Sequence, residues 1–302
     1  MSRFERILFV VNPAAGAGTA PARATALKRE LAIRGYSPPV IVETVAAGNP
    51  ELVERVGSSD LVVAFGGDGT LNRVVSTIVL GRLQPSPVVA FLPCGTGNAA
   101  ARAFNLPRSP QRLAAYVASV RPRDLDVGIA SRDGQDIGAF LLWAGAGVDA
   151  ALITEVARRR PTTQGRELIS QYLRVAAGML FKYHFPTIQI EVGESRCSAA
   201  SVVVANVGAM AIGSLTRKAD PCDGTLDIIG TASRSRAAWI GAAMLSATNR
   251  YDRCSDVVRL RGTDISLTTD EPVPVHLDGE PAGDLPVQIR VAPRSIRLLA
   301  RE

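Results

Sequence analysis

The stretch VVAFGGDGTLNRVV, residues 62–75, decides the fold of the N-terminal part of this chain. An uninterrupted apolar run ending at Phe65 is typical of a strand buried on both faces of a parallel sheet. Two glycines, Asp68, a third glycine and Thr70 follow, and then apolar residues at helical spacing. Because glycine has no Cβ, its backbone comes close to a ligand, and the N–H groups of such a turn and of a helix N-terminus bind anions. The stretch therefore predicts a strand, a phosphate-binding turn and a helix.

Asp68 adds a requirement to that turn. A carboxylate would repel phosphate unless it faced a metal ion or bridging water, so the turn favours a nucleotide phosphate together with Mg²⁺. A ligand-free strand-to-helix turn is the alternative for any single glycine turn. Three glycines with Asp and Thr within five residues favour the ligand. The sequence contains no GxxxxGK[ST], which argues against a P-loop enzyme.

Two further loops occupy equivalent places in the chain. NPAAGAG, residues 12–18, and PCGTGN, residues 93–98, each follow an apolar run that reads as a strand. Strand and helix signals alternate over the first 120 or so residues, which predicts a parallel sheet covered by helices. Ligands bind beyond the carboxyl ends of such strands. We therefore expect the three loops to converge on one crevice.

Composition limits the class of protein. The chain has 302 residues, 47% of them hydrophobic, which predicts two domains with sizeable cores. A net charge of +6 favours anionic partners, but 5% aromatic residues without interleaved basic residues speak against nucleic acid. The polar start, the four scattered cysteines and apolar runs too short to span a bilayer predict a cytoplasmic protein without a secretory signal.

The pattern changes after about residue 122. Short strand-like segments bounded by Gly, Asp or Pro predict a β-rich second domain, interrupted by helical segments at 148–182 and 233–249. The expected domains are 1–123 and 124–292. GAGVDA, residues 145–150, fits a dinucleotide fingerprint, but the acidic residue expected some 20 positions on at a strand end is missing. We interpret that match as accidental.

Two turns of the second domain are rich in carboxylates. One carries Asp220, Asp223 and Asp227, and the other carries Asp278 and Glu280. Asp-Gly between strand-like runs is typical of a hairpin turn, which explains either turn in isolation. Asp220 and Asp223 would alternatively suit a hard cation, and a carboxylate near the crevice would suit a general base.

Together these motifs resemble the diacylglycerol kinase catalytic family, which includes sphingosine kinases and bacterial soluble lipid kinases. The resemblance rests on motifs that run through nearly the whole chain: NPAAGAG, GGDGTLN, GTGNAAARAF-LP, DLDVG, DPCDGTLD and HLDGE. GGDGT alone would also fit NAD kinases and phosphofructokinases. The resemblance implies an α/β nucleotide domain with a parallel sheet, followed by an all-β, sandwich-like domain with helical insertions. It leaves open whether the last strand, 293–302, returns to the first domain.

The resemblance also implies the site. It implies Mg²⁺ near Asp220, Asp223 and Thr225, a catalytic base at Glu280 supported by Asp278, and a catalytic role for Asp68 with the metal. The implied contacts to ATP are Asn12, Pro13, Ala14, Ala15, Gly16, Thr44, Gly66, Gly67, Asp68, Gly69, Thr70, Leu71, Asn72 and Thr96.

The expected activity is transfer of the ATP γ-phosphoryl group to a lipid hydroxyl, diacylglycerol-like or sphingoid-like, at the inner face of a membrane. The apolar segment 168–185 and the basic residues 158–160 are candidates for contact with lipid, or alternatively a core helix with a solvated cap. Arg73 and Ala99 stand where many family members have carboxylates. Two alternatives stay open: a kinase of a soluble acceptor such as NAD, and a non-catalytic nucleotide- or lipid-binding protein. Homodimerisation is also open.

Overall fold

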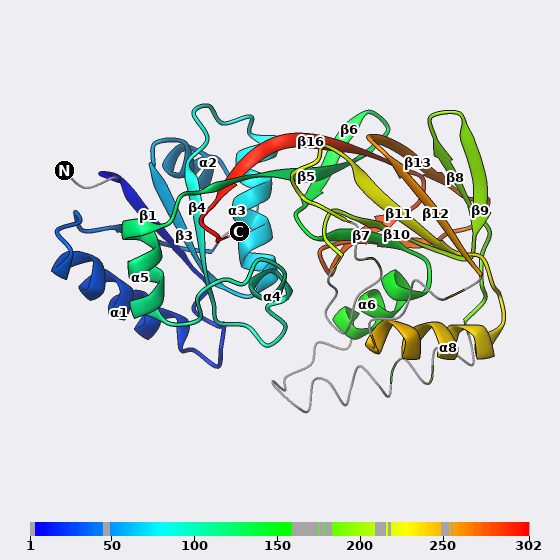
Figure 1. The fold of residues 1–302 in the computed structure, drawn as a ribbon, viewed down its shortest axis with the longest axis horizontal. Coiled ribbons are helices and arrows are strands. Elements are labelled where there is room, and N and C mark those ends of the chain that lie inside the picture. The colour runs from blue at the N-terminus through cyan, green and yellow to red at the C-terminus, as the bar shows by residue number, and fades with distance from the viewer. Residues whose placement is uncertain are drawn as a thin grey trace. The chain divides into compact units, whose positions relative to one another are not determined.

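The computed structural model describes residues 4–44, 49–158, 175, 178, 183–208, 216, 219–248, 254 and 256–301. The chain divides into two compact units: unit 1 is Met1–Val127 with Pro293–Glu302, and unit 2 is Gly128–Ala292. Strands β5 (Arg123–Arg132) and β16 (Val287–Leu298) carry the chain from one unit into the other (Figure 1). The division lies within β5, between Val127 and Gly128, and the expected domains 1–123 and 124–292 stay a prediction.

Unit 1 contains a parallel sheet in the order β2-β1-β3-β4, with the end of β16 alongside β4. Its strands are β1 (Ile7–Val11), β2 (Val40–Glu43), β3 (Leu61–Gly66) and β4 (Val88–Pro93). All residues of β1, β3 and β4 are buried, as expected for strands covered on both faces. Because these strands are parallel, the carboxyl ends of β1, β3 and β4 lie at the same end of the sheet.

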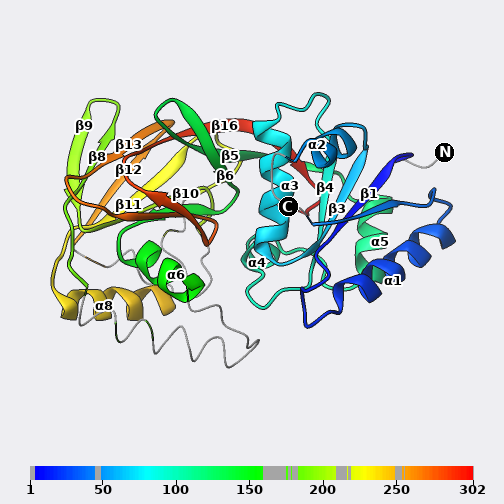
Figure 2. The same ribbon diagram turned by 180° about the vertical axis from the view of Figure 1, so that it is seen from behind.

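Helices cover this sheet, as Figures 1 and 2 show. They are α1 (Ala20–Ile33), α2 (Pro50–Gly57), α3 (Asp68–Leu80), α4 (Ala99–Ala103) and α5 (Pro110–Ser119). The side chain of Asn49 accepts N–H bonds from Glu51 and Leu52 and so caps α2. Leu27 of α1 and Leu113 of α5 belong to one core cluster with alternate residues of the strands.

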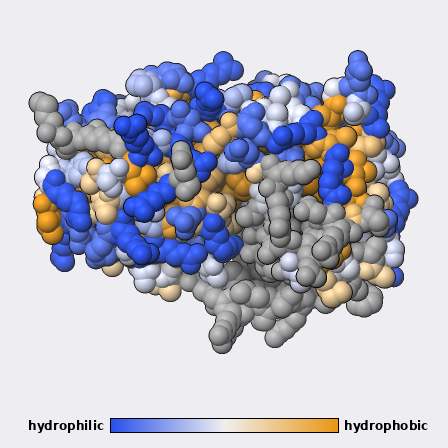
Figure 3. Space-filling view, viewed as in Figure 1, coloured by the Kyte–Doolittle hydropathy of each residue, from blue (hydrophilic) through white to orange (hydrophobic). Residues whose placement is uncertain are grey.

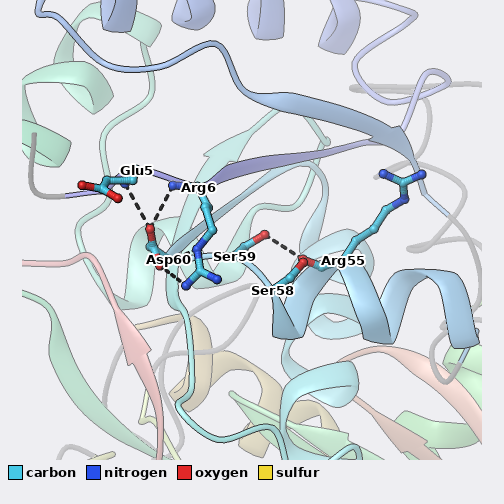
Figure 4. A network of polar contacts seen from close by, with 6 residues as sticks. All are labelled: Glu5, Arg6, Arg55, Ser58, Ser59 and Asp60. Carbon is cyan, nitrogen blue, oxygen red and sulfur yellow. Dashed lines mark hydrogen bonds and ion pairs between the residues drawn. The ribbon is translucent and has the colours of Figure 1, made fainter.

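The starts of β1 and β3 are joined by a polar network, shown in Figure 4. The Asp60 carboxylate accepts the backbone N–H groups of Glu5 at 3.0 Å and Arg6 at 2.9 Å. It also accepts the Arg6 guanidinium Nε at 3.1 Å, and this hydrogen bond lowers the pKa of Asp60 below its usual value. The hydroxyls of Ser58 and Ser59 donate to the Arg55 carbonyl at the end of α2. These hydrogen bonds therefore connect the segments that precede β1 and β3.

Unit 2 is built from antiparallel strands in two layers. One layer has the order β12-β11-β10-β7-β14-β15, and the other contains β16-β13-β8-β9 with β5 and β6. The strands are β6 (Gln135–Phe140), β7 (Trp143–Ala146), β8 (Ile188–Val192), β9 (Ser195–Ala199), β10 (Ser201–Ala205), β11 (Leu226–Thr231), β12 (Val257–Gly262), β13 (Asp264–Thr268), β14 (Pro274–Leu277) and β15 (Glu280–Asp284). Side chains of both layers, among them Ile190 and Val204, form one core cluster. This is sandwich packing.

Helices α6 (Val148–Arg158) and α8 (Arg236–Ala247) lie within unit 2. The prediction of an α/β domain followed by a β-sandwich-like domain with helical insertions is therefore confirmed. Most of the expected helical segment beyond residue 158, including Arg159 and Arg160, lies outside the described residues.

No helix among the described residues is long and apolar enough to cross a membrane. In Figure 3 polar and apolar residues are interspersed over the part of the visible face that is not grey. Large exposed apolar side chains include Val40 and Ile41 on the edge strand β2.

Candidate active site

The three glycine loops of unit 1 pack backbone against backbone. A Cβ on Gly95 would lie 2.7 Å from the Cα of Gly67, and one on Gly16 would lie 2.5 Å from the carbonyl oxygen of Cys94. The Asn12 N–H donates to the Phe65 carbonyl at 2.9 Å, joining the first loop to the end of β3. Contacts this close leave no room for a side chain. The structure thus brings together the loops that follow β1, β3 and β4.

Asp68 connects two of these loops. Its two carboxylate oxygens accept the backbone N–H groups of Ala99 and Ala100, each at 2.9 Å. The sequence led us to expect a metal ion or bridging water at this carboxylate. The structure shows both oxygens accepting N–H groups at the start of α4, because exposed N–H groups at a helix start attract a carboxylate, and the metal contact stays a prediction. Asp68 therefore holds the third loop against the second.

Two buried polar atoms at these loops have no hydrogen-bond partner among the described residues: Thr44 Oγ1 and Asn98 Oδ1. The Thr44 N–H donates to the Val11 carbonyl at 2.8 Å, which places Thr44 beside the first loop. Asn98 has a left-handed backbone, and its amide nitrogen donates to the Gly95 carbonyl. An unpaired buried polar atom costs about 1–3 kcal/mol, so both atoms fit a site that a polar ligand completes. Sequence reasoning named Thr44 as an ATP contact but missed Asn98.

The other residues expected to contact ATP differ in their solvent exposure. Pro13, Ala14 and Thr96 are exposed, whereas Thr70 and Leu71 are buried. The Thr70 hydroxyl fills the space that a Cβ on Gly66 would need. The side chains of Thr70 and Leu71 therefore pack α3 under the turn, and their contact with ATP stays a prediction. The Asn12 side chain accepts the Ala14 N–H at 3.1 Å and so shapes the backbone of the first loop. The Asn72 side chain accepts the Ser76 hydroxyl at 3.2 Å, one turn further along α3.

Arg23 of α1 supports the third loop and was not foreseen from the sequence. Its guanidinium donates to the Pro93 carbonyl at 2.6 Å and to the Arg108 carbonyl. It also lies 3.5 Å from Cys94 Sγ. Burial raises the pKa of the Cys94 thiol, and the charge of Arg23 opposes that rise. A lone arginine within a helix gives no sequence signal for such a contact.

In unit 2 the two expected catalytic carboxylates have different surroundings. Asp278 is only 9% exposed, and it accepts the N–H groups of Leu141 at 2.8 Å, Leu142 at 2.8 Å and Trp143 at 3.0 Å. Glu280 is exposed at the first position of β15. Asp278 therefore organises the backbone before β7, while Glu280 is accessible.

The expected cation ligands are already engaged. Asp223 accepts the Thr225 N–H at 2.9 Å and its hydroxyl at 2.7 Å, and its other oxygen pairs with Arg261. Asp220 accepts the Cys222 N–H at 3.1 Å. In the described part of the chain, no group of three or more His, Cys, Asp or Glu could hold a metal ion. As arranged, these residues do not fit Mg²⁺, because Arg261 already supplies the positive charge.

The GAGVDA stretch joins β7 to α6. Strand β7 pairs antiparallel with β10 and with β14. A dinucleotide fingerprint belongs to a parallel βαβ unit, so the strand pairing here is of another kind.

The architecture defines a two-unit protein with an α/β N-terminal unit and a β-sandwich unit. The sequence model of the diacylglycerol kinase catalytic domain matches residues 6–130. The model of the YegS C-terminal NAD kinase beta sandwich-like domain matches residues 143–300. The chain therefore belongs to the family that combines these two domains, and the resemblance inferred from its motifs is confirmed.

Individual relatives are similar to this chain over most of its length. The chain is 26% identical to a diacylglycerol kinase of Bacillus subtilis, over 75% of this chain and 73% of the relative. It is 25% identical to an uncharacterised protein of Synechocystis over 83% of this chain, but spans only 59% of that relative's length. A crystal structure of a diacylglycerol kinase from Bacillus anthracis superposes with a TM-score of 0.72 at 21% identity, covering 100% of this chain and 98% of that one. The last comparison establishes the shared fold.

Proposed function

We propose that this protein is an ATP-dependent lipid kinase that transfers the γ-phosphoryl group of ATP to a lipid hydroxyl. Family membership supports an ATP-dependent phosphotransferase. The observation that carries the proposal is the close packing of the three glycine loops of unit 1, here called the glycine cradle, in which Gly67 meets Gly95 and Gly16 meets Cys94. Two unpaired buried oxygens lie at these loops, Asn98 Oδ1 in the third loop and Thr44 Oγ1 next to the first. Relatives named as diacylglycerol kinases support the lipid acceptor.

The roles within the cradle follow from its contacts. ATP would supply the phosphoryl group, held by N–H groups of the glycine loops and by the side chains of Thr44 and Asn98. Asp68 and Arg23 keep the loops in register through the bonds described above. Phosphoryl transfer depends mainly on positioning and electrostatic stabilisation, which a rigid cradle of backbone donors supplies.

Glu280 is the proposed base. In this step the lipid hydroxyl oxygen forms a bond to the γ-phosphorus, the bond to ADP breaks, and Glu280 takes the hydroxyl proton. Glu280 is preferred to Asp278 because it is exposed, while Asp278 is occupied by three backbone N–H groups. A positioned general base is worth about 10²–10⁴-fold in rate.

The proposal includes peripheral contact with the inner face of a membrane, where the lipid would be presented. The net charge of +6 supports attraction to anionic lipid. Arg158, the last residue of α6, is the described member of the basic group expected to make that contact.

The test is incubation of the purified protein with radiolabelled ATP and MgCl₂ and a panel of diacylglycerol, ceramide and sphingoid bases in mixed micelles. A labelled lipid that disappears with Glu280→Gln is the expected result. Label on NAD or another soluble acceptor without lipid would establish the first alternative. ATP binding without label on any acceptor would establish a non-catalytic binding protein.

A further inference from the structure

His276 of β14 is fully buried, and both of its ring nitrogens have partners. Nδ1 accepts the backbone N–H of Gly279 at 3.2 Å. Nε2 lies 3.2 Å from Asp149 Oδ2. A nitrogen that accepts an N–H carries no proton of its own, so the proton of the neutral ring is on Nε2 and is donated to Asp149. The two contacts therefore specify one tautomer.

The surroundings keep Asp149 in place at the start of α6. A Cβ on Gly145 of β7 would overlap both Asp149 Oδ2 and His276 Nε2, so glycine is needed for the pair to form. The Ser201 hydroxyl, which donates to the Ala146 carbonyl at 2.9 Å, lies 3.4 Å from Asp149 Oδ1. The same carboxylate acts on Tyr183. Burial raises the pKa of Tyr183, and the negative charges of Asp149 and Glu271 raise that pKa further.

The other end of this chain of contacts is the turn that precedes Glu280. Asp278 and Gly279 have φ values of 49° and 88°, as the two central residues of a type I′ hairpin turn require. Two sets of hydrogen bonds hold the turn. The Asp278 carboxylate accepts the N–H groups of residues 141–143, and the Gly279 N–H donates to His276 Nδ1. Glu280 is the next residue and pairs with Leu277 across the hairpin, so this turn sets the position of its backbone and the direction in which its side chain leaves β15.

We propose that Asp149 and His276 are positioning residues for Glu280, acting through the hydrogen bond from the Gly279 N–H to His276 Nδ1. This inference rests on the proposed function, in which Glu280 is the base. Asp149 orients the imidazole by accepting its Nε2 proton, and the imidazole fixes the turn. Neither residue is assigned a contact with the reacting atoms.

Two amide substitutions separate the two ends of the imidazole. In His276→Asn the side-chain oxygen takes the place of Nδ1 and can still accept the Gly279 N–H, but the contact with Asp149 is lost. In His276→Gln the amide nitrogen takes the place of Nε2 and can still donate to Asp149, but the acceptor for Gly279 is lost. We expect His276→Gln to lower kcat about tenfold or more with KM for ATP unchanged, since base placement affects the chemical step.

His276→Asn should retain more kcat than His276→Gln. Asp136→Asn is the matched control, because it breaks the Asp136–Arg290 ion pair of unit 2, at 2.7 Å, which shares no residue with the chain of contacts from Asp149 to Glu280. It should lower Tm without lowering kcat. Equal loss of kcat in the Asn and Gln variants, or a rise in KM for ATP that accounts for the loss, would overturn the positioning role.

A measurement on the unmutated protein separates this inference from the proposed function. Nitrogen NMR of ¹⁵N-histidine-labelled protein at neutral pH should show His276 protonated on Nε2 alone. Hydrogen exchange followed on uniformly ¹⁵N-labelled protein should show that the Gly279 amide exchanges slowly with solvent. Protonation on Nδ1, or fast exchange at Gly279, would overturn the contact chain whatever the activity. A wild type with this tautomer and slow exchange, but without any lipid kinase activity, would overturn the proposed function and with it the role toward Glu280.

Discussion

Gly67 and Gly95 touch so closely that a Cβ on Gly95 would lie 2.7 Å from the Gly67 Cα, whereas a Cβ on Gly67 would lie 3.7 Å from the Gly95 Cα. The first distance is a clash between the added Cβ and the Gly67 backbone, and the second is ordinary van der Waals contact. A methyl group is thus excluded at Gly95 but has room at Gly67, and two matched substitutions can test what this contact does.

Gly95→Ala should separate the second and third loops and weaken ATP binding about tenfold or more, since the cradle depends on their contact. Gly67→Ala should leave Tm close to that of the wild type, because its methyl group has room. The measurements are thermal unfolding and titration with a fluorescent ATP analogue. Gly95→Ala with wild-type Tm and wild-type affinity would show that the loops do not need this contact.

Asp68→Asn should destabilise unit 1 and weaken ATP binding. An amide keeps one acceptor oxygen and turns an NH₂ group toward the Ala99 or Ala100 N–H. Loss of one buried acceptor costs about 1–3 kcal/mol. The check is urea unfolding together with kcat and KM at several MgCl₂ concentrations. Unchanged stability, with activity restored by excess MgCl₂, would instead identify Asp68 as a metal ligand.

Glu280→Gln should affect the chemical step, whereas Asp278→Asn should affect the stability of the fold. We expect Glu280→Gln to lower kcat by about 10²–10⁴-fold, the usual contribution of a general base, with Tm and ATP affinity unchanged. Asp278→Asn should lower Tm, because the amide cannot accept all three N–H groups of residues 141–143. An unchanged kcat in Glu280→Gln would remove that residue from the mechanism.

Asp60→Asn should lower the free energy of unfolding by about 0.5–1.5 kcal/mol, the net worth of a typical hydrogen bond. The hydrogen bond from Arg6 lowers the pKa of Asp60 in the folded protein, so this carboxylate stabilises the fold above its unfolded-state pKa. That stability is lost as the pH falls through the lowered pKa. Urea unfolding at pH 7 and pH 3 should therefore show a smaller difference between variant and wild type at pH 3.

A useful comparison is Glu51→Gln, which removes an exposed ion pair with Arg55 at 3.0 Å. Exposed pairs contribute little, so its effect at pH 7 should be smaller than that of Asp60→Asn. An Asp60→Asn effect that does not change between pH 7 and pH 3 would contradict the role assigned to the Arg6 contact.

The sequence alone was enough to predict the two kinds of domain, the order of strands and glycine loops in unit 1, and the family. Apolar runs, helical spacing and glycines at loops are local properties, and local periodicity is what a sequence displays directly. The hairpin turn at Asp278 and Gly279 also follows from local sequence, because Asp-Gly between strand-like runs is typical of such turns.

Only the tertiary structure decided what the carboxylates do. Asp278 binds the N–H of Leu141, 137 residues away in sequence, and Asp68 binds Ala99, 31 residues away. Arg23, Asn98 and the Asp149–His276 pair have no local signature either. A side chain with hydrogen-bonding capacity takes whichever partner the packed strands bring within about 3 Å, and that partner is set by long-range register and not by neighbouring residues.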